Sequence, residues 1–182
     1  MKEKYIAFLR GINVGGHHKV PMGELRTTME KLGFEEVVTI LNTGNILFNA
    51  IAKDVEQLEK TISEHLEKVF GFPIPTILRK WEMMEELLNS HPFEAEVMTK
   101  DTRLYVSFLK KEVETAFPLP WVNEDKSYKI LEKRAKVVLS ILDVSAFKTT
   151  KAMGILEKQF GKKNITTRNW KTIKRIEKKV LS

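Results

Sequence analysis

The residues best suited to chemistry lie in a glycine-rich segment that runs Arg10-Gly11-Ile12-Asn13-Val14-Gly15-Gly16-His17-His18-Lys19-Val20-Pro21. Glycines let backbone N–H groups approach a ligand, and a helix that begins near Pro21 would favour negative charge at the same place. A second turn, Thr43-Gly44-Asn45, adds a hydroxyl and an amide that could orient a polar ligand. We therefore expect a site for an anionic or phosphate-bearing ligand, with the candidate binding residues Arg10, Asn13, Gly15, Gly16, Lys19, Thr43, Gly44 and Asn45.

Turn geometry alone would also explain these residue types. Gly15-Gly16 and Gly44 suit backbone conformations with positive φ, and Asn13 and Asn45 can bond to local backbone groups. The spacing matches neither the G-x-G-x-x-G pattern nor the P-loop, so it specifies no nucleotide. The ligand-site and turn interpretations both remain open.

Histidine chemistry is an alternative at this segment, because His17 and His18 are adjacent. An enzyme acting on a small polar metabolite could use Arg10, Asn13 and Thr43 to position its substrate and a histidine to transfer a proton. No nucleophile with a nearby base is evident, and two histidines without a third ligand make a weak metal site. The sequence therefore assigns no catalytic residue, metal or cofactor, and it leaves enzymatic activity open.

A second candidate site is the basic C-terminal end of the chain. The formal net charge is +7 and the pI is near 9.5. Residues 145–182 hold 11 Lys or Arg and 2 Asp or Glu, a net charge of +9, so the remaining residues carry a net charge of −2. Such a cluster could bind nucleic acid or another polyanion, or it could be a solvated helix surface. The candidate polyanion contacts are Arg168, Lys171, Lys174 and Arg175.

Composition predicts a cytoplasmic protein. The chain of 182 residues contains no cysteine, which fits a reducing compartment. Its N-terminus is charged and leads straight into a short strand, unlike a signal peptide. No apolar run approaches the roughly 18 residues that span a bilayer, so we expect no membrane association.

Hydrophobic patterns predict the order β-α-β-β-α-β in the first half. The apolar run at residues 5–9 is typical of a strand buried on both faces. In the ferredoxin-like arrangement the usual strand order is 4-1-3-2, which places the strand containing Pro75 at an edge and brings the two glycine turns to the same end. The expected strands are at residues 5–9, 37–41, 46–48 and 74–78, and the expected helices run from Pro21 to Gly33 and from Asp54 to Gly71.

The second half predicts a similar order with a weaker pattern. We therefore expect an α+β fold of two ferredoxin-like halves, at residues 1–80 and 81–182, ending in a basic helix. After a connecting helix at residues 81–88, the expected strands are at 103–109, 127–132, 136–141 and 164–166, and the expected helices are at 112–117, 145–160 and from about Arg168 onward.

Motifs along the whole chain resemble a bacterial family known as domain of unknown function 1697. The family is marked by the segment from Tyr5 to Gly16, followed by Lys19-Val20-Pro21-Met22, Leu32-Gly33-Phe34, Thr43-Gly44-Asn45, His91-Pro92-Phe93 and Thr167-Arg168-Asn169-Trp170. The resemblance implies two ferredoxin-like halves but no activity. Thr43 stands where the family usually has serine, and His17-His18 occupy positions that other members commonly fill with different polar residues, which argues against a histidine mechanism.

Three classes of function follow from these observations. The leading hypothesis is a protein that binds an anionic or phosphate-bearing ligand at the N-terminal loops, with nucleic acid as one such partner. The alternatives are an enzyme acting at the same loops and a scaffold or interaction module. The sequence does not specify an oligomeric state.

Overall fold

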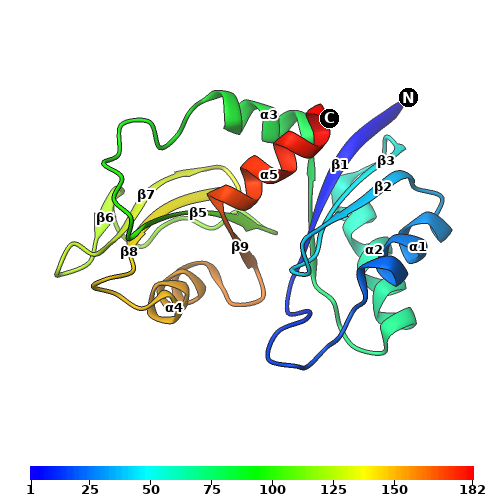
Figure 1. Cartoon of the computed structure of the whole chain (residues 1–182), viewed down its shortest axis with the longest axis horizontal. Coiled ribbons are helices and arrows are strands. Elements are labelled where there is room, and N and C mark those ends of the chain that lie inside the picture. The colour runs from blue at the N-terminus through cyan, green and yellow to red at the C-terminus, as the bar shows by residue number, and fades with distance from the viewer. The chain divides into compact units, whose positions relative to one another are not determined.

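The computed structural model describes all residues from Met1 to Ser182, and its contacts divide the chain into two compact units, Met1–His91 and Pro92–Ser182 (Figure 1). Each unit combines an antiparallel sheet with helices, so the chain has a mixed α+β fold. None of its helices combines the length and the apolar character that crossing a membrane requires.

The first unit contains a four-stranded sheet with the order β2-β3-β1-β4. This is the strand order that the sequence predicted, and the strand that follows Pro75 lies at the edge. Helices α1 and α2 cover one face of the sheet, and α3 continues directly from β4 (Figure 1). The elements are β1 (Lys2–Leu9), α1 (Met22–Lys31), β2 (Glu35–Ile40), β3 (Asn45–Ile51), α2 (Val55–Phe70), β4 (Thr76–Lys80) and α3 (Trp81–Asn89).

β1 is a central strand of this sheet, and its sequence accounts for that position. It pairs with β3 on one side and with β4 on the other. Tyr5, Ala7 and Leu9 belong to the core under α1 and α2. On the opposite face, Ile6 and Phe8 are also fully buried. Burial on both faces confirms what the continuous apolar run predicted.

The helices of the first unit differ at their N-termini. The side chain of Asp54 caps α2 by accepting a hydrogen bond of 2.9 Å from the backbone N–H of Gln57. At the other end of α2, Gly71 adopts a left-handed conformation with φ of 82° and donates to the carbonyl of Glu67. By contrast, Pro21 precedes α1 and supplies no side-chain cap. The N–H groups at the start of α1 therefore remain available.

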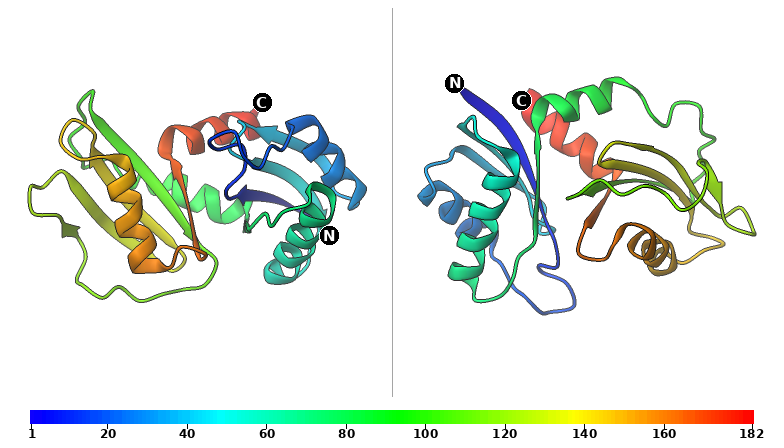
Figure 2. Two further views of the ribbon diagram at one scale, coloured as in Figure 1. Left: turned by 90° about the horizontal axis from the view of Figure 1, so that it is seen from below. Right: turned by 180° about the vertical axis from the view of Figure 1, so that it is seen from behind.

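The second unit contains a five-stranded sheet with the order β6-β7-β8-β5-β9. Ala152, Leu156 and Phe160 attach α4 to the core of the unit. α5 contacts β5 and β9, and Figure 2 shows α4 and α5 on opposite faces of the sheet. The elements are β5 (Thr102–Leu109), β6 (Trp121–Val122), β7 (Tyr128–Arg134), β8 (Val137–Asp143), α4 (Thr149–Phe160), β9 (Ile165–Asn169) and α5 (Trp170–Leu181).

The helix predicted at residues 112–117 is wrong, because this segment is not helical. Val113, Phe117 and Leu119 pack against the core, while the residues next to each of them are exposed. Such a period of two is typical of extended chain, and Pro118 disfavours helical backbone at the residue before it. The short strand β6 follows and was not predicted. The second unit therefore lacks the first helix of the predicted β-α-β-β-α-β order.

Two further boundaries differ from the sequence-based expectation. α4 begins at Thr149 instead of residue 145, because Ser145 donates its backbone N–H and its hydroxyl to Oδ1 of Asp143, at 2.9 and 2.6 Å. The contacts place α3 in the first unit, where it packs against β1 and β4, whereas the sequence-based division fell before it.

Candidate functional site

The glycine-rich segment folds into a small hairpin, which we call the finger and define as residues 13–18. Val14 and His17 form an antiparallel bridge, and the backbone N–H of Asn13 donates to the carbonyl of His18 at 3.0 Å. Gly15 and Gly16 occupy the tip with φ of 59° and 76°. Positive φ at both central residues is the geometry of a type I′ turn, for which glycine is favoured. Turn geometry therefore explains this glycine pair.

His18 attaches the finger to the rest of the first unit. Its ring stacks on Phe72, with 4.4 Å between ring centroids and an angle of 14° between the planes. Nδ1 of His18 also lies 3.2 Å from the carbonyl oxygen of Gly11. The chain holds no group of three or more side chains suited to binding a metal ion. The ring of His18 thus has a packing role that the sequence did not suggest.

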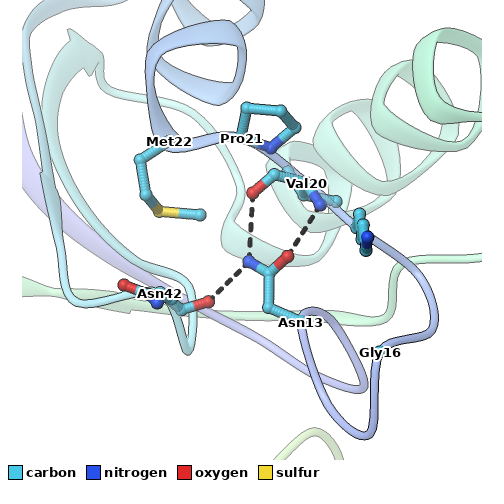
Figure 3. Close-up of a pocket in the computed structure, with 7 residues that line it drawn as sticks. Asn13, Gly16, Val20, Pro21, Met22 and Asn42 are labelled. Carbon is cyan, nitrogen blue, oxygen red and sulfur yellow. Dashed lines mark hydrogen bonds between the residues drawn. The ribbon is translucent and has the colours of Figure 1, made fainter.

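Asn13 joins the finger to the turn at residues 41–44 (Figure 3). Its side-chain oxygen accepts from the N–H of Val20 at 2.8 Å, and its amide nitrogen donates to the carbonyl of Val20 at 3.0 Å. The same nitrogen donates to the carbonyl of Asn42 at 2.8 Å. These bonds bring the two glycine turns together, as the strand order predicted. Because these bonds engage both the oxygen and the nitrogen of the Asn13 amide, Asn13 holds the two turns in place.

The second turn is closed by Gly44 and Asn45. The N–H of Leu9 donates to the carbonyl of Gly44 at 2.8 Å, and an added Cβ at Gly44 would lie 2.8 Å from side-chain atoms of both Leu9 and Ile12. Asn45 is fully buried and donates to the carbonyl of Ile40 and to the hydroxyl of Thr43. Gly44 and Asn45 therefore hold the turn against β1.

A pocket of about 510 Å³ lies between the finger and the 41–44 turn. Val20, Pro21 and Met22 give it an apolar wall, whereas Lys19 brings a positive charge to its rim. In Figure 3 the side chain of Met22 projects toward Asn42. The complete lining consists of Asn13, Gly16, Lys19, Val20, Pro21, Met22 and Asn42.

The pocket includes the N-terminus of α1. The first intrahelical hydrogen bond runs from the N–H of Leu25 to the carbonyl of Pro21 at 3.0 Å, so the preceding helical N–H groups have no acceptor within the helix. Those N–H groups carry the positive end of the helix dipole. Lys19 is exposed and adds a full charge beside them, while the exposed Glu24 in the first turn opposes it in part. This combination favours an anion.

Left-handed backbone conformations gather around the same pocket. Asn13, His18 and Leu41 are not glycines, yet their φ angles are 55°, 51° and 60°. Such conformations cost free energy for residues with a side chain and persist where surrounding bonds hold them. Here the bonds of Asn13 and the stacking of His18 supply that constraint.

The structure brings together only some of the candidate residues. Asn13, Gly16 and Lys19 line the pocket, and Gly15 is exposed at the tip of the finger. Thr43 is exposed in the neighbouring turn, and Arg10 is half-buried with its backbone N–H bonded to Pro75. Neither lines the pocket. Met22, Val20 and Asn42 do line it, although the sequence suggested only core, connecting or turn roles for them.

The four candidate polyanion contacts near the C-terminus differ in how exposed their side chains are. Arg168 is only 9% exposed and donates to the hydroxyl of Thr166 at 2.9 Å and to the carbonyl of Thr167 at 3.1 Å. Burial lowers the pKa of its guanidinium to about 10. Arg168 is therefore not a surface cation. Lys174 forms an ion pair with Glu177, whereas Lys171 and Arg175 are exposed on α5.

Comparison with known proteins places this architecture in a family. A sequence model described as "Protein of unknown function (DUF1697)" matches residues 1–136. The chain belongs to this family. The DUF1697 match includes the finger, the 41–44 turn and every residue that lines the pocket.

One solved structure has the same fold as this DUF1697 member. It is the conserved bacterial protein SP0830 from Streptococcus pneumoniae, with a TM-score of 0.75, 24% sequence identity and 100% of each chain covered. At this identity the similarity concerns the fold alone. The comparison with curated proteins gives no match.

Proposed function

We propose that the pocket between the finger and the 41–44 turn binds a small phosphate-bearing molecule. The observation that carries this proposal is the uncapped N-terminus of α1, which enters the pocket beside Lys19. Free N–H groups at a helix N-terminus form a ready anion site, and a nearby ammonium adds charge. Arg10, Gly15 and Thr43 do not line the pocket, and we propose no direct ligand contact for them.

The apolar wall indicates what else such a ligand contains. Val20 is buried, Met22 is half-buried, and both line the pocket with Pro21. A free inorganic anion would gain nothing from this wall, whereas a phosphate ester could place its organic part there and bury apolar surface. The preferred ligand is therefore a small phosphate ester.

Exchange of Lys19 tests the charged part of this site. Lys19→Gln should weaken the binding of phenyl phosphate to the full chain about fivefold, which corresponds to roughly 1 kcal/mol. The measurement is isothermal titration calorimetry, with thermal unfolding to check that stability is retained. Lys31→Gln is the matched control, because Lys31 is an exposed lysine in the last turn of the same helix. Equal weakening in both variants would contradict a local role for Lys19.

The enzymatic alternative has less support. This alternative requires Arg10, Asn13 and Thr43 to position a substrate, but the Asn13 amide holds the finger and the Thr43 hydroxyl accepts from Asn45. The ring of His18 packs on Phe72, so a proton-transfer role would fall to the exposed His17. The binding function requires none of these groups to react.

We further propose that both units follow one ferredoxin-like plan in a cytoplasmic protein. In the first unit the elements run β1-α1-β2-β3-α2-β4. The second sheet contains the strand order β7-β8-β5-β9, which matches the order β2-β3-β1-β4 of the first sheet. Residues 112–117 are extended at the place where the ferredoxin-like plan has its first helix. The absence of cysteine supports a reducing compartment.

A further inference from the structure

The two units form the same hydrogen bonds at one corner. In the first unit, the N–H groups of Leu9 and Arg10 donate to the carbonyls of Gly44 and Pro75, at 2.8 and 3.0 Å. In the second unit, the N–H groups of Leu109 and Lys110 donate to the carbonyls of Lys136 and Asn164, both at 2.8 Å. The end of β5 therefore corresponds to the end of β1, where the first unit has its pocket.

The side chain of Asn164 joins the turn after α4 to the backbone at the end of β5. Its side-chain oxygen accepts from the N–H of Lys111 at 2.7 Å, and its amide nitrogen donates to the carbonyl of Lys111 at 2.9 Å. The turn after α4 is thereby fixed against the end of β5. Lysines that are distant in sequence become neighbours as a result. We call the exposed residues Lys110, Lys111, Lys162 and Lys163 the lysine corner.

The lysine corner keeps its positive charge. None of its ammonium groups takes part in an ion pair of the chain. Two acidic residues of the same unit are already engaged, since Glu112 pairs with Lys133 at 3.0 Å and Glu132 pairs with Arg134 at 2.7 Å. Lys162 and Lys163 follow the C-terminus of α4, where cations are favourable, but the helix dipole does not account for Lys110 and Lys111.

We propose that the lysine corner binds the phosphate backbone of double-stranded nucleic acid. Lysines are point charges that contact phosphates without reading bases, so this binding would be independent of sequence. Proteins that bind single strands add aromatic side chains on which bases stack. The aromatic residues closest in sequence, Phe108 and Phe160, are instead buried. Phe117 and Trp121 pack against each other and against the core of the unit. The corner thus fits a duplex better than a single strand.

This site differs from the one that the sequence suggested for a polyanion. The sequence predicted contacts at residues of β9 and α5, namely Arg168, Lys171, Lys174 and Arg175. The basic C-terminal region also contains Lys162 and Lys163 of the lysine corner, but not Lys110 and Lys111. The lysine corner is also independent of the proposed phosphate-ester site, which belongs to the first unit. Each can fail without the other.

A salt titration of duplex binding tests the lysine corner. Fluorescence polarisation would measure binding of the full chain to a 20-base-pair DNA duplex of mixed sequence. A plot of log K against log salt concentration has a slope to which each phosphate contact contributes about 0.9. Replacing all four lysines of the corner with glutamine should therefore reduce the size of this slope by about 3 to 4. Circular dichroism would show that the variant is folded.

The matched control removes the same charge from α5. Its substitutions are Lys171→Gln, Arg175→Gln, Lys178→Gln and Lys179→Gln, all at exposed positions. We expect this variant to keep most of the wild-type slope. Absence of duplex binding by the wild type at low salt would overturn the proposal, and so would an equal or larger loss in the α5 variant. Retention on vesicles with anionic lipids but not on the duplex would overturn it as well.

Discussion

At the scale of single residues, the glycines and asparagines of the candidate site have different roles. Gly15 and Gly16 form an exposed turn with open space around them, whereas Gly44 is pressed against Leu9 and Ile12. The sequence predicted that each glycine would suit a turn. It could not show that Gly44 touches two core side chains, because that contact depends on how β1 and β3 pair.

Alanine at Gly44 should destabilise the protein more than alanine at Gly15. Both positions have positive φ, which costs a residue with a Cβ about 1–2 kcal/mol. Only at Gly44 would the Cβ also collide with neighbours, which adds about 1–3 kcal/mol. Chemical denaturation of Gly44→Ala and Gly15→Ala compares the two free energies of unfolding. Equal losses would show that close packing at Gly44 contributes nothing.

At the scale of secondary-structure elements, capping residues predicted both ends of α2, whereas the start of α4 and the path of residues 112–117 were not predicted correctly. Asp54 and Gly71 marked α2 by their residue types, and both act as its caps. The segment at residues 112–117 is predicted from the sequence as a weak helix that ends at Pro118. Its alternating burial arises from packing on the unit's core, which local propensity does not reveal.

The uncapped start of α1 leads to a prediction about its cap position. Pro21→Ser would supply a hydroxyl that accepts from the N–H groups of the first turn, and a serine cap is worth about 1 kcal/mol. Loss of the proline offsets much of this gain, by about 0.4–1 kcal/mol, because it raises the conformational entropy of the unfolded chain. We therefore expect nearly unchanged stability but weaker binding of phenyl phosphate, because the hydroxyl competes for the same N–H groups.

Two controls separate capping from binding. Pro21→Ala removes the ring without adding an acceptor, so it should bind phenyl phosphate more tightly than Pro21→Ser. Lys148 precedes α4, which also lacks a side-chain cap. Lys148→Ser should therefore stabilise the protein by about 1 kcal/mol and leave binding unchanged. Calorimetry measures the affinity for phenyl phosphate, and chemical denaturation measures the free energy of unfolding. Tighter binding by Pro21→Ser than by Pro21→Ala would show that the serine hydroxyl does not compete with the ligand.

At the scale of the whole molecule, charge is organised by the fold as much as by the sequence. The C-terminal region carries a net charge of +9, but Arg168 is buried and Lys174 is paired. Meanwhile Lys110 and Lys111 join Lys162 and Lys163 through the bonds of Asn164. The sequence could predict where basic residues are frequent, but not which of them share a surface, because that follows from pairing between distant strands.

The strand order of the first unit explains why the location of the candidate site was predictable. β1 and β3 are antiparallel neighbours, so the finger and the 41–44 turn meet at one end of the sheet. The pocket itself was not predictable, because its wall depends on the orientation of Val20 and Met22 beside the bonded amide of Asn13.

The most direct test of the proposed phosphate-ester site is a nuclear magnetic resonance titration. The ¹⁵N-labelled full chain would be titrated with phenyl phosphate while backbone amide signals are followed. The account predicts saturable shifts concentrated at Gly16, Lys19, Gly23 and Glu24, around the finger and the N-terminus of α1. Saturable shifts confined to other parts of the chain, or no saturable shift at all, would contradict it.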